Sequence, residues 1–162
     1  MAKQKKKESD KKADLLVCRN PKARKLYEIE EKLEAGLVLV GSEVKSLRNR
    51  RGDLEGSYAG FHGDELFLYK MHIAPYEQAT AFGHEPTRVR KLLLHRRELE
   101  KLHTRLTIRG YTLVPLSVYF KNGHAKVELG LGKGRAKRDK REEIKRDLDK
   151  KEARQVMQKH RR

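Results

Sequence analysis

The clearest pattern in the chain is an alternation of side chains between residues 111 and 131. In its first half, one side carries Thr112, Val114, Leu116, Val118 and Phe120, and the other carries Tyr111, Leu113, Ser117 and Tyr119. A period of two is typical of a strand. Asn122 and Gly123 favour the positive φ angles of a tight turn, and alternating apolar residues then carry the chain back to Leu131. The pattern predicts an antiparallel hairpin that leads into a basic segment, 132–141, which is too charged to bury.

Weaker patterns upstream predict further strands. Residues 26–33 fit both a helical face and an alternating strand, and Gly36 with the apolar run after it favours the strand. Residues 37–40 form a short apolar run ended by Gly41, which predicts a core strand. The other predicted strands are residues 65–70, which follow a turn at 62–64, residues 71–76, where Pro75 stops pairing, and residues 88–91, with Arg88 and Arg90 on the exposed side.

Two segments carry helix signals. Ser42 is placed to cap a short helix over residues 43–48, and Glu43 is favourable at the positive end of its dipole. In the second segment, His95 stands at the cap position, Glu98 completes a capping box and Gly110 ends the helix. The apolar residues between them, at helical spacing, are Leu99, Leu102 and Leu106. Together the elements predict a mainly β fold: an OB-type antiparallel β-barrel with flanking α-helices and a basic C-terminal tail.

The positive charge is concentrated at the two ends of the chain. The formal net charge is +17, of which residues 1–12 carry +4 and residues 133–162 carry +8. Ends with so much charge and so few apolar residues are typical of solvated tails and nucleic-acid arms. We therefore expect a disordered Lys-rich N-terminal arm over residues 1–17, an RNA-binding barrel over residues 18–132 and a basic tail over residues 133–162.

A charge of this size makes a polyanion the natural partner. No apolar run approaches the ~18 residues of a membrane-spanning helix. No signal-peptide core follows the Lys-rich start. Nucleic acid is therefore preferred to a membrane surface.

Motifs of catalytic or metal chemistry are missing from the sequence. There is no HExxH, CxxC, GxSxG or Walker-type loop. Gly130, Gly132 and Gly134 have the spacing of a phosphate loop, but the segment after them lacks the apolar face of a docking helix. His95 and His103 have no metal-ligand pattern around them, and the single Cys18 fits a reducing cytosol. We predict a binding protein with no enzymatic activity, no cofactor and no metal.

Aromatic side chains are the second kind of candidate for contact with RNA. Exposed rings can stack on unpaired bases, and the candidates are Tyr58, Phe61, Tyr76 and Tyr119. The alternative is that each ring fills the core. That alternative is favoured, because the chain has no Trp and few aromatic residues to fill a barrel.

Five blocks of sequence, taken in order, carry a family resemblance. They are EAGLVLVGSEVKSLR (34–48), DLEGSYAGFHGDELFL (53–68), MHIAPYE (71–77), PTRVRKLLLHRREL (86–99) and GYTLVPLSVYFKNGHAKVELGLGKG (110–134), with DKR (139–141) after them. In these blocks the chain resembles the SmpB family, the SsrA-binding proteins. The resemblance implies an OB-type barrel, no enzymatic activity and transfer-messenger RNA as partner. In that family the protein clasps the tRNA-like part of this RNA and escorts it to stalled ribosomes, where trans-translation tags the nascent chain for proteolysis.

The resemblance also implies which residues face the RNA. Carried onto this chain they are Arg19, Asn20, Lys22, Ala23, Glu43, Lys45, Ser46, Arg48, Arg88, Arg90 and Lys91, with Lys121 and Lys126 as weaker candidates. Glu43 is the unusual member of a cationic surface. It can accept hydrogens from base amino groups, hold a basic neighbour in place, or merely complement the helix dipole.

For the C-terminal tail, the resemblance implies entry into the decoding centre of the small subunit and the empty messenger channel. We expect the tail to be disordered when free and helical on the ribosome. The predicted tail contacts are Lys133, Arg135, Lys137, Arg138, Asp139, Lys140, Arg141, Lys145, Val156 and Met157. Arg138 departs from the family, where His or Tyr is common at this position, although a guanidinium plane can also stack on a base.

The resemblance further implies the GTP-bound elongation factor that carries aminoacyl-tRNA as a partner, a cytoplasmic location and a monomeric free protein. One alternative is a ribosomal protein or a generic OB-fold single-stranded RNA-binding protein, which would explain the same charge and barrel. The other is a nuclease or RNA-modifying enzyme, which the missing metal and nucleophile motifs disfavour.

Overall fold

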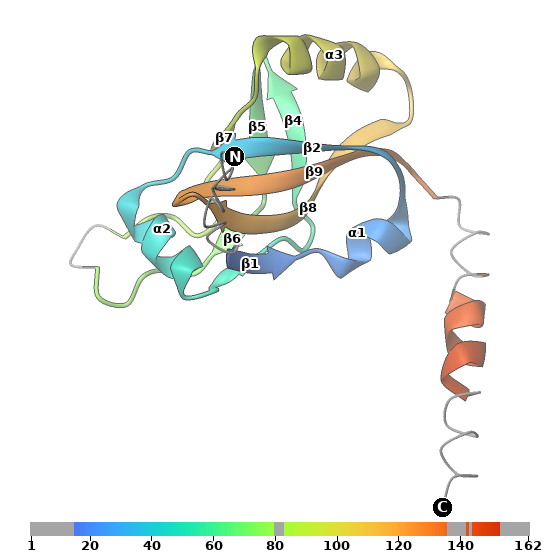
Figure 1. The fold of residues 1–162 in the computed structure, drawn as a ribbon, viewed down its shortest axis with the longest axis horizontal. Coiled ribbons are helices and arrows are strands. Elements are labelled where there is room, and N and C mark those ends of the chain that lie inside the picture. The colour runs from blue at the N-terminus through green and yellow to red at the C-terminus, as the bar shows by residue number, and fades with distance from the viewer. Residues whose placement is uncertain (1–14, 80–82, 136–141, 143, 153–162) are drawn as a thin grey trace, which may run out of the picture.

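Antiparallel strands form a barrel with helices packed around it (Figure 1). This computed structural model describes residues 15–79, 83–135, 142 and 144–152. In chain order the elements are β1 (Leu15–Arg19), α1 (Pro21–Leu26), β2 (Tyr27–Leu37), α2 (Gly41–Arg48), β3 (Gly52–Asp53), β4 (Tyr58–His62), β5 (Glu65–Tyr69), β6 (His72–Ile73), β7 (Arg90–Leu93), α3 (Arg96–Thr107), β8 (Tyr111–Lys121) and β9 (His124–Gly134).

The main sheet has the strand order β1-β8-β4-β5-β7-β2-β9, and a further pairing of β8 with β9 closes it. The pairings around this ring are antiparallel, and β3 and β6 form a separate two-stranded sheet. The predicted mainly β, OB-type barrel with flanking helices is therefore confirmed.

The β8–β9 hairpin, predicted from the alternating pattern, is confirmed. The two strands pair from Tyr111 with Lys133 to Lys121 with His124. Asn122 and Gly123 form the turn with φ angles of 51° and 79°, which the Asn-Gly pair adopts at little cost. On its other side β9 pairs with β2 from Tyr27 to Gly36, so β9 is held by two ladders.

The strict alternation predicted for β8 is wrong, because a bulge interrupts the strand. The register with β9 shifts between Pro115 and Ser117. An extra residue in one strand reverses the faces of the side chains that follow it. As a result Leu113 shares the main core with Val118 and Phe120, whereas the side chains that pack in a second cluster with α1 are Val114 and Leu116.

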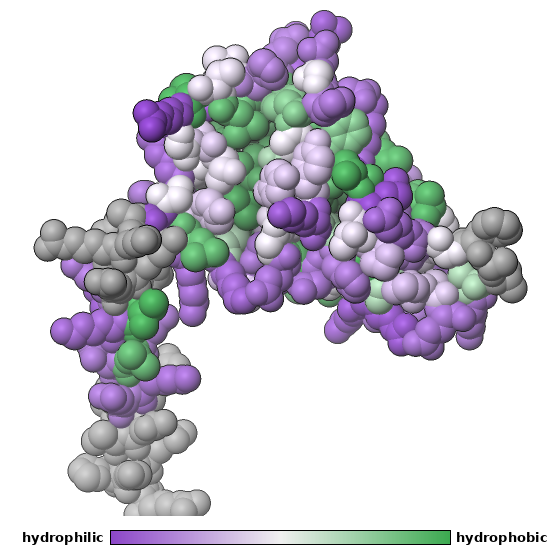
Figure 2. Space-filling view, turned by 180° about the vertical axis from the view of Figure 1, so that it is seen from behind, coloured by the Kyte–Doolittle hydropathy of each residue, from purple (hydrophilic) through white to green (hydrophobic). Residues whose placement is uncertain are grey.

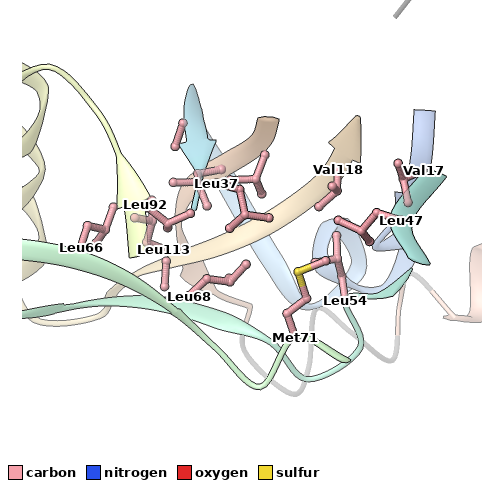
Figure 3. Close-up of a cluster of buried hydrophobic side chains, with 14 of the residues drawn as sticks. Val17, Leu37, Leu47, Leu54, Leu66, Leu68, Met71, Leu92, Leu113 and Val118 are labelled. Carbon is pink, nitrogen blue, oxygen red and sulfur yellow. The ribbon is translucent and has the colours of Figure 1, made fainter. Parts of the chain in front are cut away.

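Leucines from many elements fill the inside of the barrel, while hydrophilic side chains cover much of the outside (Figure 2). Leu66, Leu113 and Leu129, from three different strands, are fully buried. Each such side chain stabilises the fold by about 1.5–3 kcal/mol relative to exposure. Figure 3 shows this core, to which α2 contributes Leu47 and β1 contributes Val17.

Both predicted boundaries of the barrel need correction. Leu15, Leu16 and Val17 were expected in a disordered arm, but they form β1, which pairs with β8. At the other end, Lys133 and Gly134 were expected in the tail, but they complete β9 opposite β2 and β8. Backbone pairing with the sheet therefore extends the barrel by at least three residues at its start and by two at its end.

Four element predictions also differ from the structure. Of the expected core strand 37–40 only Leu37 is in a strand, and the next residues turn outward, with Val38 and Val40 exposed. The residue that precedes the first turn of α2 is Val40 instead of Ser42. β7 begins at Arg90, two residues later than predicted, and α3 ends at Thr107, before Gly110. The ambiguous segment 26–33 is a strand from Tyr27 onward.

Gly132 marks the closest approach of β9 to β2. A Cβ atom at this position would lie 2.2 Å from the Glu28 carbonyl oxygen, a backbone atom of the neighbouring ladder. We predict that Gly132→Ala lowers the free energy of unfolding by about 3 kcal/mol, because the strands must separate to admit the methyl group.

Urea unfolding measures this effect. Gly134→Ala, where nothing lies within 4 Å of the added atom, is the matched control and should change the free energy by less than about 0.5 kcal/mol. Superimposable curves for Gly132→Ala and the parent would contradict the close approach.

Candidate nucleic-acid interface

α1 and the residues before it carry the first group of predicted RNA contacts, Arg19, Asn20, Lys22 and Ala23. The Asn20 side-chain oxygen accepts a hydrogen bond from the Ala23 amide at 3.2 Å, which caps the helix, and Pro21 occupies its first position. The Asn20 amide group also donates to the carbonyls of Leu54 and Pro115. α1 is therefore fastened to the barrel by its cap.

This fastening decides which side chains of the segment can reach RNA. Ala23 is only 1% exposed and packs on β8, so its side chain lies under the surface of the barrel. Asn20 is half-buried and its amide group is occupied by the barrel. Arg19, Lys22 and Arg24 are exposed, and Lys22 pairs with Glu55.

Glu43 is the most buried charge of the region. Its side chain is 0% exposed and accepts a hydrogen bond from the Val40 amide at 3.0 Å. Arg88 donates to both carboxylate oxygens, at 3.2 and 2.7 Å, and Arg90 donates to one of them at 2.8 Å. Of the three interpretations of Glu43, the structure supports the one in which it holds basic neighbours in place.

Burial alone would raise the pKa of the Glu43 carboxyl. The hydrogen bonds from Arg88 and the Val40 amide, together with the charges of Arg90 and Arg88, outweigh it, so the pKa lies below its ordinary value. Burial lowers the pKa of the Arg90 guanidinium, and the Glu43 charge opposes that change. The guanidinium of Arg90 also donates to the carbonyls of Met71, Arg88 and Pro86. This network joins α2 to β7 and to the segments beside it.

Three of the predicted contacts are buried in and around this network. Glu43, Ser46 and Arg90 are all 0% exposed, so they lie under the surface. β7 therefore does not present Arg90 on an exposed cationic side. Arg90 turns inward because a fully paired guanidinium can be buried beside a carboxylate, and sequence alternation does not reveal that partner. Arg88 remains partly exposed, at 35% of its side chain.

The outward side of α2 is cationic. Lys45 and Arg48 are exposed, and each lies over an aromatic ring: the Lys45 Nζ atom is 5.4 Å from the Tyr76 ring centroid, and the Arg48 Cζ atom is 5.8 Å from that of Phe120. Cation–π contacts hold the charges in place without neutralising them. Among the described residues, no ion pair with a carboxylate is formed by Arg19, Lys45 or Arg48, in contrast to most of the other predicted contacts.

The cations of the β8–β9 hairpin meet Glu34, a residue that the sequence analysis did not single out. Lys121 lies 3.1 Å and Lys126 4.0 Å from this carboxylate. The Tyr119 hydroxyl donates a hydrogen bond to the Glu34 carboxylate and holds its pKa below the ordinary value, and both lysines act in the same direction. The charge of Lys121 and Lys126 is therefore partly neutralised. In the same way Lys91 pairs with Glu65 on β5.

Only part of the predicted tail is described. Lys133 is in β9 with its Nζ atom 4.5 Å from the Tyr111 ring centroid, the Arg135 amide donates to the Leu26 carbonyl, and Lys145 is exposed on a helix over residues 144–152. That the tail becomes helical on the ribosome stays a prediction. The predicted contacts that lie outside the described residues are Lys137, Arg138, Asp139, Lys140, Arg141, Val156 and Met157.

Residues 15–79, 83–135, 142 and 144–152 contain no group of three or more His, Cys, Asp or Glu side chains able to hold a metal ion. Within the same ranges no helix is long and apolar enough to cross a membrane. Burial, with Asp53 nearby, raises the pKa of the Cys18 thiol to about 11, so this thiol is not activated.

The sequence matches the family model described as SmpB protein over residues 17–159. The chain belongs to the SmpB family. The SsrA-binding protein of Geobacillus thermodenitrificans is 56% identical over 131 residues, which cover 81% of this chain and 84% of that protein. The SsrA-binding protein of Chloroflexus aurantiacus is 56% identical over 130 residues, which cover 80% and 81%. The resemblance drawn from the sequence blocks is thus confirmed.

A solved structure gives the same result for the fold. The chain in "tmRNA-SmpB: a journey to the center of the bacterial ribosome" has a TM-score of 0.66 and 46% sequence identity to this chain. The match covers 82% of this chain and 96% of that one. The described SmpB barrel therefore has a solved counterpart over nearly its whole length.

The contribution of the buried Glu43 carboxylate to stability can be tested by substitution. Glu43→Gln keeps the shape of the side chain but removes the charge that compensates Arg90. We predict a loss of about 3–5 kcal/mol in the free energy of unfolding at pH 7, since an unpaired buried charge remains. Glu65→Gln, which breaks the exposed pair with Lys91, is the control and should cost at most about 1 kcal/mol.

Glu43→Gln and the parent protein can also be compared as a function of pH. The pKa of Glu43 is lower in the folded than in the unfolded chain, so its stabilisation is complete above its ordinary pKa of about 4.5 and is lost as pH falls through the folded value. Denaturant unfolding from pH 7 to pH 3 should show a smaller decline in Glu43→Gln than in the parent. An equal decline in both proteins would contradict the role of Glu43.

Proposed function

We propose that this chain binds the tRNA-like domain of transfer-messenger RNA and delivers it to stalled ribosomes for trans-translation. The observation that carries the proposal is membership of the SmpB family. The similar proteins are called SsrA-binding proteins, and the name of the similar solved structure contains tmRNA-SmpB and the bacterial ribosome. The cationic surface that the barrel presents supports it. The family is one of RNA-binding proteins, and we propose that this chain likewise acts without enzymatic chemistry.

Arg19, Lys45 and Arg48 are the residues we expect at the centre of the contact. They are exposed and keep their full charge, so they can neutralise phosphates and release counterions. Arg24 and the partly exposed Arg88 extend this surface. Glu43 and Arg90 act from beneath it by fixing the position of α2 and of Arg88.

The tail has a separate task in this proposal. It enters the decoding centre and the empty messenger channel, where RNA surrounds it and its positive charge is matched. We also propose that the RNA complex travels with the GTP-bound elongation factor that carries aminoacyl-tRNA. The protein is monomeric when free and acts in the cytoplasm.

A first experiment tests the specific RNA contact. In a gel shift at moderately high salt, the parent protein should bind transfer-messenger RNA much more tightly than an elongator tRNA or a random RNA of equal length. Arg48→Ala should weaken that binding about tenfold and reduce the slope of affinity against salt by about one, because one phosphate contact is lost.

Arg109→Ala is the matched control for Arg48→Ala. Arg109 is also exposed, but it follows α3, so its removal should change the affinity less than about twofold. Equal binding of all three RNAs would instead assign the chain to the generic cationic RNA binders.

A truncation tests the division of labour between barrel and tail. A chain that ends at Gly134 keeps all of β9 and hence both of its ladders. It should bind transfer-messenger RNA like the full chain in a gel shift, yet fail to support tagging on stalled ribosomes in a reconstituted translation assay. Loss of RNA binding by the truncated chain would show that the two tasks are not separate.

A further inference from the structure

The outward face of the β4–β5 hairpin carries three aromatic rings. The register pairs Tyr58 with Tyr69 and Gly60 with Phe67. Their neighbours along the two strands, Ala59, Leu66 and Leu68, are buried in the core, so the alternation of a strand turns the three rings outward. We call Tyr58, Tyr69 and Phe67 the aromatic strip.

These rings are placed on the surface although the chain has few aromatic residues. Among the buried hydrophobic side chains of the described part, Phe120 is the one aromatic residue. Tyr58 is 43% exposed, and Tyr69 and Phe67 are half-buried. The expectation that Tyr58 fills the core is therefore wrong. Leucines fill the barrel instead, which leaves the rings available for another purpose.

The geometry of the strip is that of a stacking surface. The Tyr58 and Tyr69 ring centroids lie 5.2 Å apart, and their planes are inclined by 16°. Gly60 lies beside them without a side chain, and a Cβ atom there would lie 3.6 Å from Tyr69 Cε2. The space that this glycine leaves open borders the Tyr69 ring. A flat group can therefore approach the rings from the side of β4.

A cation, Lys70, lies at the end of the strip and has an unfavourable backbone conformation. Lys70 follows β5 with a φ of 59°, in the left-handed region that residues with a side chain rarely adopt. Its Nζ atom lies 6.0 Å from the Tyr58 ring centroid, and it forms no ion pair within the described residues. Strain of this kind persists where the surroundings enforce it, commonly at binding sites.

The carboxylates on this face do not give it a strong negative potential. Glu65 is paired with Lys91 on β7, and Asp64 lies in the turn at the far end of the hairpin from Lys70. Figure 2, which views the barrel from the side of β4 and β5, shows hydrophobic and weakly polar side chains here with hydrophilic ones around them. In Figure 1 the turn of the hairpin points toward α3. Tyr58 and Tyr69 pair at the opposite end of the ladder, a few residues after Glu55, which pairs with Lys22 of α1.

We propose that the aromatic strip is a second RNA site, which binds unpaired bases by stacking while Lys70 binds an adjoining phosphate. Aromatic rings stack on any base, and a neighbouring cation supplies the charge that the backbone needs. The net charge of +17 draws a polyanion to the protein before a neutral partner. The site lies on other elements than the cationic surface on α1 and α2, and it selects single strands because a duplex hides the faces of its bases.

Fluorescence anisotropy of the full chain with a labelled adenosine hexanucleotide tests the proposal. The comparison ligand is a short duplex with the same number of phosphates, measured at the same moderately high salt. The hexanucleotide should bind more tightly. Tyr58→Ala should weaken its binding about tenfold, whereas Tyr58→Phe, which keeps the ring, should leave it unchanged.

Gly60→Val is the second variant, and it guards against a loss of folding. Valine suits a strand, the nearest atom to its Cβ is at ordinary contact distance, and its methyl groups occupy the open space beside Tyr69. It should melt like the parent and bind the hexanucleotide about tenfold more weakly, with duplex affinity unchanged. Parent-like binding of the hexanucleotide by Gly60→Val and Tyr58→Ala, or equal affinity of the parent for both ligands, would overturn the proposal.

Transfer-messenger RNA binding by the same variants separates this inference from the proposed function. Both variants should retain it in the gel shift, because Arg19, Lys45 and Arg48 are unchanged. Failure of the parent to prefer transfer-messenger RNA would refute the proposed function and leave the strip to be judged by the hexanucleotide alone.

Discussion

One buried carboxylate determines how the cationic side of this protein is arranged. Glu43 accepts hydrogen bonds from the Val40 amide, Arg88 and Arg90, and so ties the start of α2 to β7. A buried ion pair of this kind adds little stability compared with an apolar core, but it tolerates no partial arrangement, because each unpaired charge is costly. The direction in which α2 presents Lys45 and Arg48 is thereby fixed. A carboxylate inside the most basic part of the barrel therefore fixes the positions of the Arg and Lys side chains around it.

The other carboxylates separate the positive charges into two groups. Glu34 neutralises part of the charge at the hairpin, and Glu30 and Glu31 pair with Arg105 and Lys101 to hold α3 against β2. These cations serve the fold. Arg19, Lys45 and Arg48, which form no ion pair among the described residues, keep their charge for a partner. The net charge of +17 is therefore not spread evenly, and the protein attracts RNA more strongly at some parts of its surface than at others.

Much of this architecture follows from local sequence, and its exceptions have local causes. The β8–β9 hairpin was predictable because Asn122 and Gly123 determine the turn whatever the rest of the chain does. The bulge near Leu116 was not, since an extra residue leaves no mark in a run of apolar side chains. α1 was missed although Asn20 and Pro21 are a standard helix start, because its six residues show no periodicity.

The site was harder to predict than the fold for a similar reason. Charge and the family resemblance identified segments that carry exposed cations, but burial depends on partners far away in the sequence. Glu43 and Arg90 are 47 residues apart, and no spacing rule links them. Ala23 likewise followed its basic neighbours in the sequence while packing under them in space.

The position of β9 has a mechanical consequence. This strand pairs with β8 on one side and β2 on the other, and its last residue leads directly into the tail. A force applied to the tail along the strand would load two antiparallel ladders in shear, so many backbone hydrogen bonds would have to break together. The barrel should therefore resist unfolding when tension is applied to the tail, because the hydrogen bonds of β9 cannot break one after another.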